Sequence, residues 1–110
     1  MKLLPELRAI AAFGDGGFRF GDHSHRGHLL VLPSGMLAWD GMDFSAVIAA
    51  SAELDFFVLG TGAHFNRNPP LPVLPKSVQA DAMSTSAAIN SYNYMFAEGR
   101  RVGAAFIAVA

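Results

Sequence analysis

A chain of 110 residues with a net charge of −1 and no cysteine is expected to form one domain, residues 1–110, without disulfides, thiolate metal sites or thiol nucleophiles. The balanced charge offers no basic field for a phosphate backbone, so we do not expect nucleic-acid binding. Hydrophobic residues make up 52% of the chain and charged residues 15%. Such an apolar chain either builds a large core or keeps apolar surface for a protein partner or a second copy of itself.

The start of the chain does not match a targeting segment. Pro5 interrupts it, and Glu6 and Arg8 add charge of both signs, unlike a secretory signal or a mitochondrial presequence. No apolar run approaches the roughly 20 residues that span a bilayer. We therefore expect a cytoplasmic protein without a membrane span.

Short apolar runs separated by turn residues predict four strands in the first part of the chain. Asp15 and Gly16 lie in a Gly-rich turn of the kind that closes a tight hairpin. Gly21–Gly27 is polar and is expected to be a turn. The predicted strands are Ile10–Phe13, Phe18–Phe20, His28–Leu32 and Met36–Trp39.

From Asp43 onward, the spacing of the apolar residues changes to that of a helix. Asp43 or Ser45 is suited to cap it, and its apolar face contains Phe44, Val47, Ile48 and Leu54. The following run, Asp55–Leu59, is continuously apolar, which is typical of a strand covered on both faces. The turn Gly60-Thr61-Gly62 ends this strand.

The last part of the chain combines a proline-rich stretch with one more helix between two strands. His64–Ser77 contains four prolines and is expected to be an extended loop. Val78–Met83 alternates like a strand, and Val102–Val109 is a long apolar strand. Between them, a helix is expected to start at Ser84, Thr85 or Ser86, to bury Ala88, Ile89, Tyr92, Met95 and Phe96, and to end at Gly99. This order predicts an α/β fold with a mixed sheet and helices on one face.

The strongest candidate site is the turn Gly60-Thr61-Gly62 together with the start of the second helix. Open α/β sheets bind ligands at the ends of their strands, and free amides at a helix start favour an anion. The hypothetical ligand-binding residues are Gly60, Thr61, Gly62, Ser84, Thr85, Ser86, Asn93 and Arg67. In the alternative interpretation the glycines form a sharp turn, the hydroxyls cap the helix, and Asn93 satisfies buried backbone groups.

Three histidines form a second, weaker candidate. His23, His25 and His28 have the His-x-His-x-x-His spacing of binuclear metallohydrolases. Gly27 stands where those enzymes have a carboxylate, and the chain is far shorter than their fold. We therefore expect a polar turn here, with no metal and no cofactor.

Five segments in a fixed order resemble one family, with the likeness extending from Gly14 to near the end of the chain. The family is a small domain of unknown function that includes mitochondrial NADH dehydrogenase (complex I) assembly factor 3 and uncharacterised bacterial and archaeal proteins. The segments are Leu30–Gly35, Trp39, Phe57–Gly62, Met83–Ala88, and Ser91–Asn93 with Glu98–Val102.

The resemblance implies a three-layer β/β/α arrangement. A central mixed sheet is expected, with helices on one face and a long last strand that curls into a smaller sheet. Relatives usually have a helix after the position of Gly62, which the proline-rich segment here replaces or reduces to a turn. The mitochondrial relatives are non-catalytic assembly factors.

Three functions follow from these observations. We expect a non-catalytic interaction or assembly-factor-type protein, because no complete catalytic set is present in the sequence and the chain is apolar. The first alternative is a module that binds a small ligand or anion at Gly60-Thr61-Gly62. The second alternative is an enzyme assembled from groups such as Ser84, His64 and Asp81, although no spacing requires it.

Overall fold

Nine strands and two helices make up the fold in the computed structural model, which describes residues 2–64 and 66–110. The helices are α1 (Ser45–Ala50), which continues into the 3-10 helix η1 (Ser51–Glu53), and α2 (Thr85–Ala97). The strands are β1 (Lys2–Leu4), β2 (Ala12–Gly14), β3 (Gly17–Phe20), β4 (His23–Arg26), β5 (His28–Leu32), β6 (Gly35–Trp39), β7 (Phe56–Gly60), β8 (Gln79–Met83) and β9 (Val102–Phe106).

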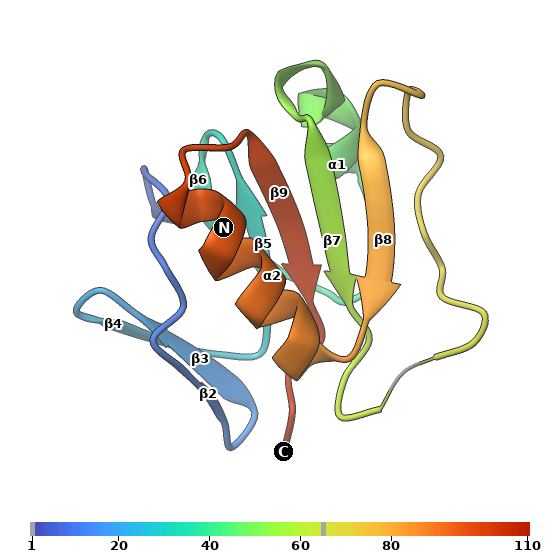
Figure 1. Ribbon diagram of the computed structural model, residues 1–110. Coiled ribbons are helices and arrows are strands. Elements are labelled where there is room, and N and C mark those ends of the chain that lie inside the picture. Colours follow the sequence, from blue (N-terminus) through green and yellow to red (C-terminus); the bar gives the residue numbers. More distant parts are fainter. Residues whose placement is uncertain (1, 65) are drawn as a thin grey trace.

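The strands form two sheets. A six-stranded sheet has the order β1-β6-β5-β9-β7-β8, and a three-stranded sheet has the order β2-β3-β4 (Figure 1). Strand β7 runs parallel to both β8 and β9, whereas the other pairs are antiparallel. A mixed α/β fold with a central mixed sheet and a second, smaller sheet is therefore confirmed.

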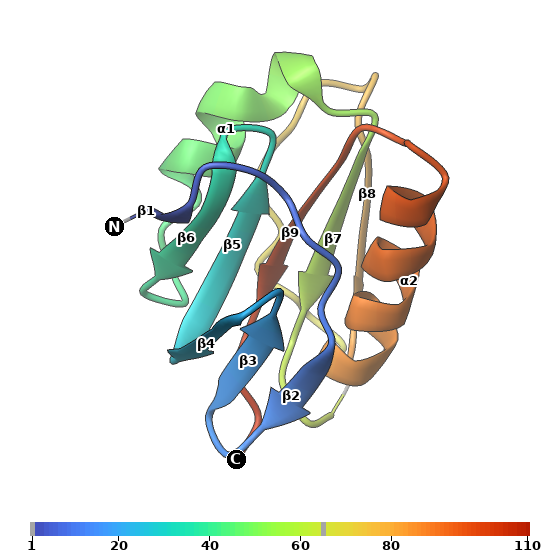
Figure 2. The ribbon, with the colours of Figure 1, turned by 90° about the vertical axis from the view of Figure 1, so that its left-hand side faces the viewer.

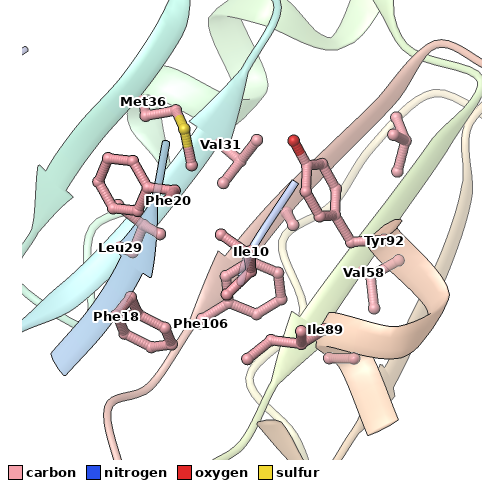
Figure 3. Packing of buried hydrophobic residues seen from close by; sticks show 13 residues of the cluster. Ile10, Phe18, Phe20, Leu29, Val31, Met36, Val58, Ile89, Tyr92 and Phe106 are labelled. Carbon is pink, nitrogen blue, oxygen red and sulfur yellow. The ribbon is translucent and has the colours of Figure 1, made fainter. Parts of the chain in front are cut away.

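Alternation along the central strands gives the large sheet two apolar faces. On β9, Ala104 and Phe106 belong to one core cluster and Ala105 to the other. The first cluster lies under the small sheet and α2, where Phe106 contacts Phe18 of β3 and Tyr92 of α2 (Figure 3). The second lies under α1 and contains Val47, Leu54, Trp39, Phe57 and Leu59, among others.

The two helices lie on opposite faces of the six-stranded sheet (Figure 2), so the expectation of helices on one face was wrong. The handedness of the connections explains this. The chain moves in one direction across the sheet from β6 through α1 to β7, and in the other direction from β8 through α2 to β9. Because crossovers between parallel strands are right-handed, opposite directions place the two helices on opposite faces.

The proline-rich connection follows the same rule. It leads from β7 to β8, in the direction of the α1 crossover, and its Leu74 packs into the cluster beneath α1. In the described part of this connection, residues 61–64 and 66–78, the structure contains no helix, as the sequence predicted. A six-residue helix and an extended segment are thus the main cover of this face.

Other differences from expectation are local: β1 was not predicted, and the N-cap of α1 is Phe44, without a side-chain hydrogen bond, instead of Asp43 or Ser45. Residues 23–26 form β4 instead of a turn, because they pair with β3 from Gly17↔Arg26 to Phe20↔His23. Ile48 is half-exposed and does not belong to the core. The last strand ends at Phe106. The tail beyond it is bonded to the turn between β2 and β3, where the amide of Gly16 donates to the carbonyl of Val109 (2.7 Å).

The Asp15-Gly16 turn has the predicted geometry. Asp15 has a φ of 53° and Gly16 a φ of 77°, and both central residues of a type I′ hairpin require positive φ. In the described part of the chain, no helix is both long and apolar enough to cross a membrane.

Candidate functional site

The end of β7, the start of α2 and the end of β9 meet at Gly60. The amide of Ile107 donates to the carbonyl of Gly60 (3.0 Å). A Cβ on Gly60 would lie 2.9 Å from the Cα of Thr85 and 3.2 Å from the ring of Phe106. Glycine is therefore needed here for the close approach of α2 to the sheet.

The hydroxyl of Thr85 fills the centre of this junction. Thr85 is fully buried. Its Oγ1 accepts a hydrogen bond from the amide of Gly62 (2.9 Å) and donates one to the carbonyl of Ile107 (2.7 Å). A single side chain thus satisfies backbone groups from two segments, as buried polar groups require.

Most amides that an anion would need at this place are bonded within the chain. The Thr61 amide donates to the Met83 carbonyl (2.8 Å), and the Thr85 amide donates to the Gly62 carbonyl (2.8 Å). Ser84 is the N-cap of α2 and accepts from the amide of Ala87 (3.3 Å). The geometry favours the structural interpretation of the turn, and anion binding there stays a prediction.

The remaining residues of that prediction lie outside the junction or serve other contacts. Ser86 is exposed on the first turn of α2, and Arg67 is exposed on the proline-rich segment. The hydroxyl of Thr61 donates to the carbonyl of His64 (2.8 Å), which holds the chain as it leaves β7.

Asn93 and Tyr92 attach the N-terminal segment to α2. Asn93 accepts from the amide of Ile10 (2.8 Å) and donates to its carbonyl (2.9 Å). The hydroxyl of Tyr92 donates to the carbonyl of Arg8 (2.7 Å), and burial raises the pKa of this phenol. These bonds agree with the interpretation of Asn93 as a partner of buried backbone groups.

Each of the three histidines of the weak metal candidate has its own contact. His25 Nε2 lies 3.0 Å from the carbonyl oxygen of His28, whose Nδ1 accepts from the amide of Ala108 (2.9 Å). The ring of His23 stacks on Phe20. Across residues 2–64 and 66–110, no three His, Cys, Asp or Glu side chains are grouped as a metal site would need.

Several large apolar side chains are exposed on the elements that cover the α1 face. Met42, in the connection to α1, is 79% exposed, and Ile48 of α1 is 49% exposed. On the proline-rich segment, Val73 is 91% exposed and Leu71 is 37% exposed. We call these four residues the apolar surface of the α1 face.

Sequence reasoning missed two arginines on the small sheet. Arg19 and Arg26 line a hollow of about 570 Å³. The alternation of Gly17-Phe18-Arg19-Phe20 indicated that Arg19 faces away from the core. Arg26 was missed because residues 23–26 were expected to form a turn.

Comparison with known proteins agrees with this architecture. The fold defines a class of small mixed α/β domains, and a solution structure from Bordetella pertussis, described as an Mth938-like domain, shares it with a TM-score of 0.72 at 23% identity, covering 98% of this chain and 92% of that one. The chain belongs to the family described as protein of unknown function (DUF498/DUF598), whose pattern matches residues 10–107. This confirms the family of unknown function that the sequence resembled.

Closer relatives leave the function open. An uncharacterized protein of Rhodobacter capsulatus is 35% identical over 102 residues, which cover 89% of this chain and 82% of that protein. A crystal structure described as an outer membrane protein from Bartonella henselae is 33% identical, with a TM-score of 0.86 over 98% of this chain and 100% of that one. The Rpa2829 protein of Rhodopseudomonas palustris is 33% identical, with a TM-score of 0.75 over 100% of this chain and 89% of that one.

Proposed function

We propose that this domain is a non-catalytic protein-interaction module of the assembly-factor type, and that it engages its partner through the apolar surface of the α1 face. The observation that carries the proposal is the exposure of Val73 and Met42, at 91% and 79%. We take these exposed apolar side chains, on the elements that cover one face of the sheet, as the surface that a partner covers.

The construction of this face supports the proposal. The cluster beneath it already includes Val47, Phe57 and Leu74, so the core does not need Met42, Ile48, Leu71 and Val73. Proline restricts the backbone of the segment that contains Val73, which lowers the entropy lost when a partner fixes it. The segment is thus suited to present apolar side chains.

From the resemblance to the mitochondrial NADH dehydrogenase assembly factor, we infer that the partner is a subunit of a larger protein complex. Assembly factors hold subunits whose apolar surfaces are not yet covered, and an exposed apolar face suits such a contact. We place this contact in the cytoplasm. Fractionation of cells that express the chain at native level tests that location, with recovery in the membrane pellet after a high-salt wash as the contrary outcome.

Site-specific photo-crosslinking tests the proposal. A photoreactive phenylalanine analogue at Val73 is expected to crosslink a defined protein in cells of the source organism. The same analogue at Tyr94, which is 66% exposed on α2, serves as the matched control on the opposite face of the sheet. Equal crosslinking from Tyr94, or none from Val73, would contradict the proposal.

A further inference from the structure

The small sheet has a core face and an outer face. Phe18 and Phe20 of β3 are buried in the core, so their neighbours Gly17 and Arg19 point to the other side. Residues paired across an antiparallel ladder share a face. The outer face therefore also contains the partners of Gly17 and Arg19, which are Ala12, Gly14, Ser24 and Arg26.

This outer face is hollowed. All six of its residues line a depression of about 570 Å³. Four of them are glycine, alanine or serine, so the floor has little side-chain cover. Gly17 has no space for a Cβ because the carbonyl oxygen of His25 lies against it. A residue without a side chain is therefore needed at Gly17 for β3 to pair with β4.

Two arginines, Arg19 and Arg26, give this depression positive charge. Arg19 and Arg26 are diagonal neighbours on adjacent strands, which places their Cβ atoms within roughly 7–8 Å. Both side chains are exposed. Arg26 donates to the carbonyl of Asp15 (3.1 Å), which fixes its guanidinium at one rim.

In the described part of the chain, neither arginine forms an ion pair with a carboxylate, and Asp15 is the acidic residue that lines the same hollow. Within residues 2–64 and 66–110, the ion pairs are Arg8–Glu6, Arg100–Glu98 and Arg101–Asp55. Guanidinium groups bind carboxylates through paired hydrogen bonds. This face is therefore positively charged and suited to bind a negatively charged group, although the whole chain has a net charge of −1.

We infer that the outer face of the small sheet binds an acidic, extended segment of a partner protein. The inference rests on the proposed interaction function and adds a second surface to it. A polypeptide fits better than a small molecule because small-molecule sites enclose most of the ligand, whereas this hollow is open and its arginines are exposed. Side chains of an extended acidic segment reach both guanidinium groups at once.

Titration of the ¹⁵N-labelled chain with a hexaglutamate peptide tests the inference by amide chemical shifts at low salt. Shifts are expected on β2, β3 and β4. Arg19→Gln and Arg26→Gln should each weaken binding roughly two- to fivefold, as for exposed ion pairs. Lys2→Gln removes the same charge from β1 and should leave binding unchanged. Asp15→Asn removes a rim carboxylate while suiting the positive φ of the turn, and should strengthen binding.

Three results would overturn the inference. The first is an absence of shifts on the small sheet, and the second is equal binding by the arginine variants and the wild type. The third is an equal response to citrate at the same concentration, which would assign a small-anion site. If crosslinking from Val73 persists while hexaglutamate fails, this inference falls and the proposed function stands. If Val73 gives no crosslink while hexaglutamate binds, the α1 face is excluded and the small sheet remains the binding surface.

Discussion

At the scale of single residues, the hydroxyl of Thr85 has the clearest energetic role. Replacing Thr85 by valine keeps the shape and removes both of its bonds, to Gly62 and Ile107. The buried amide of Gly62 and the half-buried carbonyl of Ile107 then lack partners, so we expect the free energy of unfolding in urea to fall by roughly 2–4 kcal/mol. Thr61→Val is the matched control, because its hydroxyl is only half-buried, and it should cost less than about 1 kcal/mol. Equal losses would contradict this role.

Tyr92 makes stability depend on pH in the alkaline range. Burial raises the pKa of its phenol above the ordinary value. Above about pH 10 the unfolded chain loses this proton while the folded chain keeps it, so the folded state becomes less stable as pH rises. Below about pH 10 this phenol does not reduce the free energy of unfolding. Above that pH the free energy of unfolding falls with a slope that approaches about 1.4 kcal/mol per pH unit.

The Tyr92→Phe variant isolates this effect. At neutral pH it loses the bond to the carbonyl of Arg8, at a cost of about 1 kcal/mol, but it lacks the titrating group. Denaturation curves of the variant and wild type should therefore converge between pH 9 and pH 11. Tyr94→Phe, at an exposed position of α2, should change the free energy of unfolding at neutral pH by less than about 0.5 kcal/mol. A constant gap between Tyr92→Phe and wild type would show that the phenol ionises equally in both states.

At the scale of elements, α2 also fixes the segment that leads into β2. Asn93→Ala leaves the amide and carbonyl of Ile10 without their partners. We expect a loss of roughly 1–3 kcal/mol and faster hydrogen exchange of the Ile10 amide. Asn90→Ala, exposed on the same helix, should change stability by less than about 0.5 kcal/mol. Unchanged exchange at Ile10 in Asn93→Ala would refute this function of α2.

Elements with strong local signals were predictable from the sequence. Helix α2 has a capping Ser84, an apolar stripe and Gly99 just beyond its end, and the structure agrees at both ends. Strand β4 has no such signal, since His23–Arg26 is wholly polar and pairs only because β3 presents an open edge. Its stability comes from the ladder, which local propensity does not encode.

The candidate site was predictable only in part, for the same reason. That the Gly60 turn would adjoin the start of α2 follows from two neighbouring parallel strands that end at one edge. The partners of the amides there do not follow, because the bond from Gly62 to Thr85 spans 23 positions. The bond from Ile10 to Asn93 spans 83 positions. Such contacts depend on packing, not on sequence spacing.

At the scale of the whole molecule, the direction of the crossovers leaves the two faces of the six-stranded sheet with unequal helical cover. Helix α2 has 13 residues and lies beside the small sheet on one face, whereas α1 has six residues on the other. The proline-rich segment completes this thinner face. The apolar surface of the α1 face is therefore a product of topology and of the shortness of α1.

The side chains of the apolar surface of the α1 face should contribute little to the free energy of unfolding. Met42→Ser and Val73→Ser remove exposed side chains, so each is expected to change the free energy of unfolding by less than about 0.5 kcal/mol. Leu74→Ser is the control on the same segment, since Leu74 packs into the core cluster, and it should cost more than about 1 kcal/mol. A large loss in Val73→Ser would mean that its side chain supports the fold.

The most direct test of the interaction function is the affinity of the Met42→Ser, Val73→Ser double variant for the partner that Val73 crosslinks. Removing two apolar contacts should weaken binding by at least about tenfold, or about 1.4 kcal/mol, while urea denaturation stays within about 1 kcal/mol of wild type. Wild-type affinity in a folded double variant would contradict the proposal that the α1 face is the binding surface.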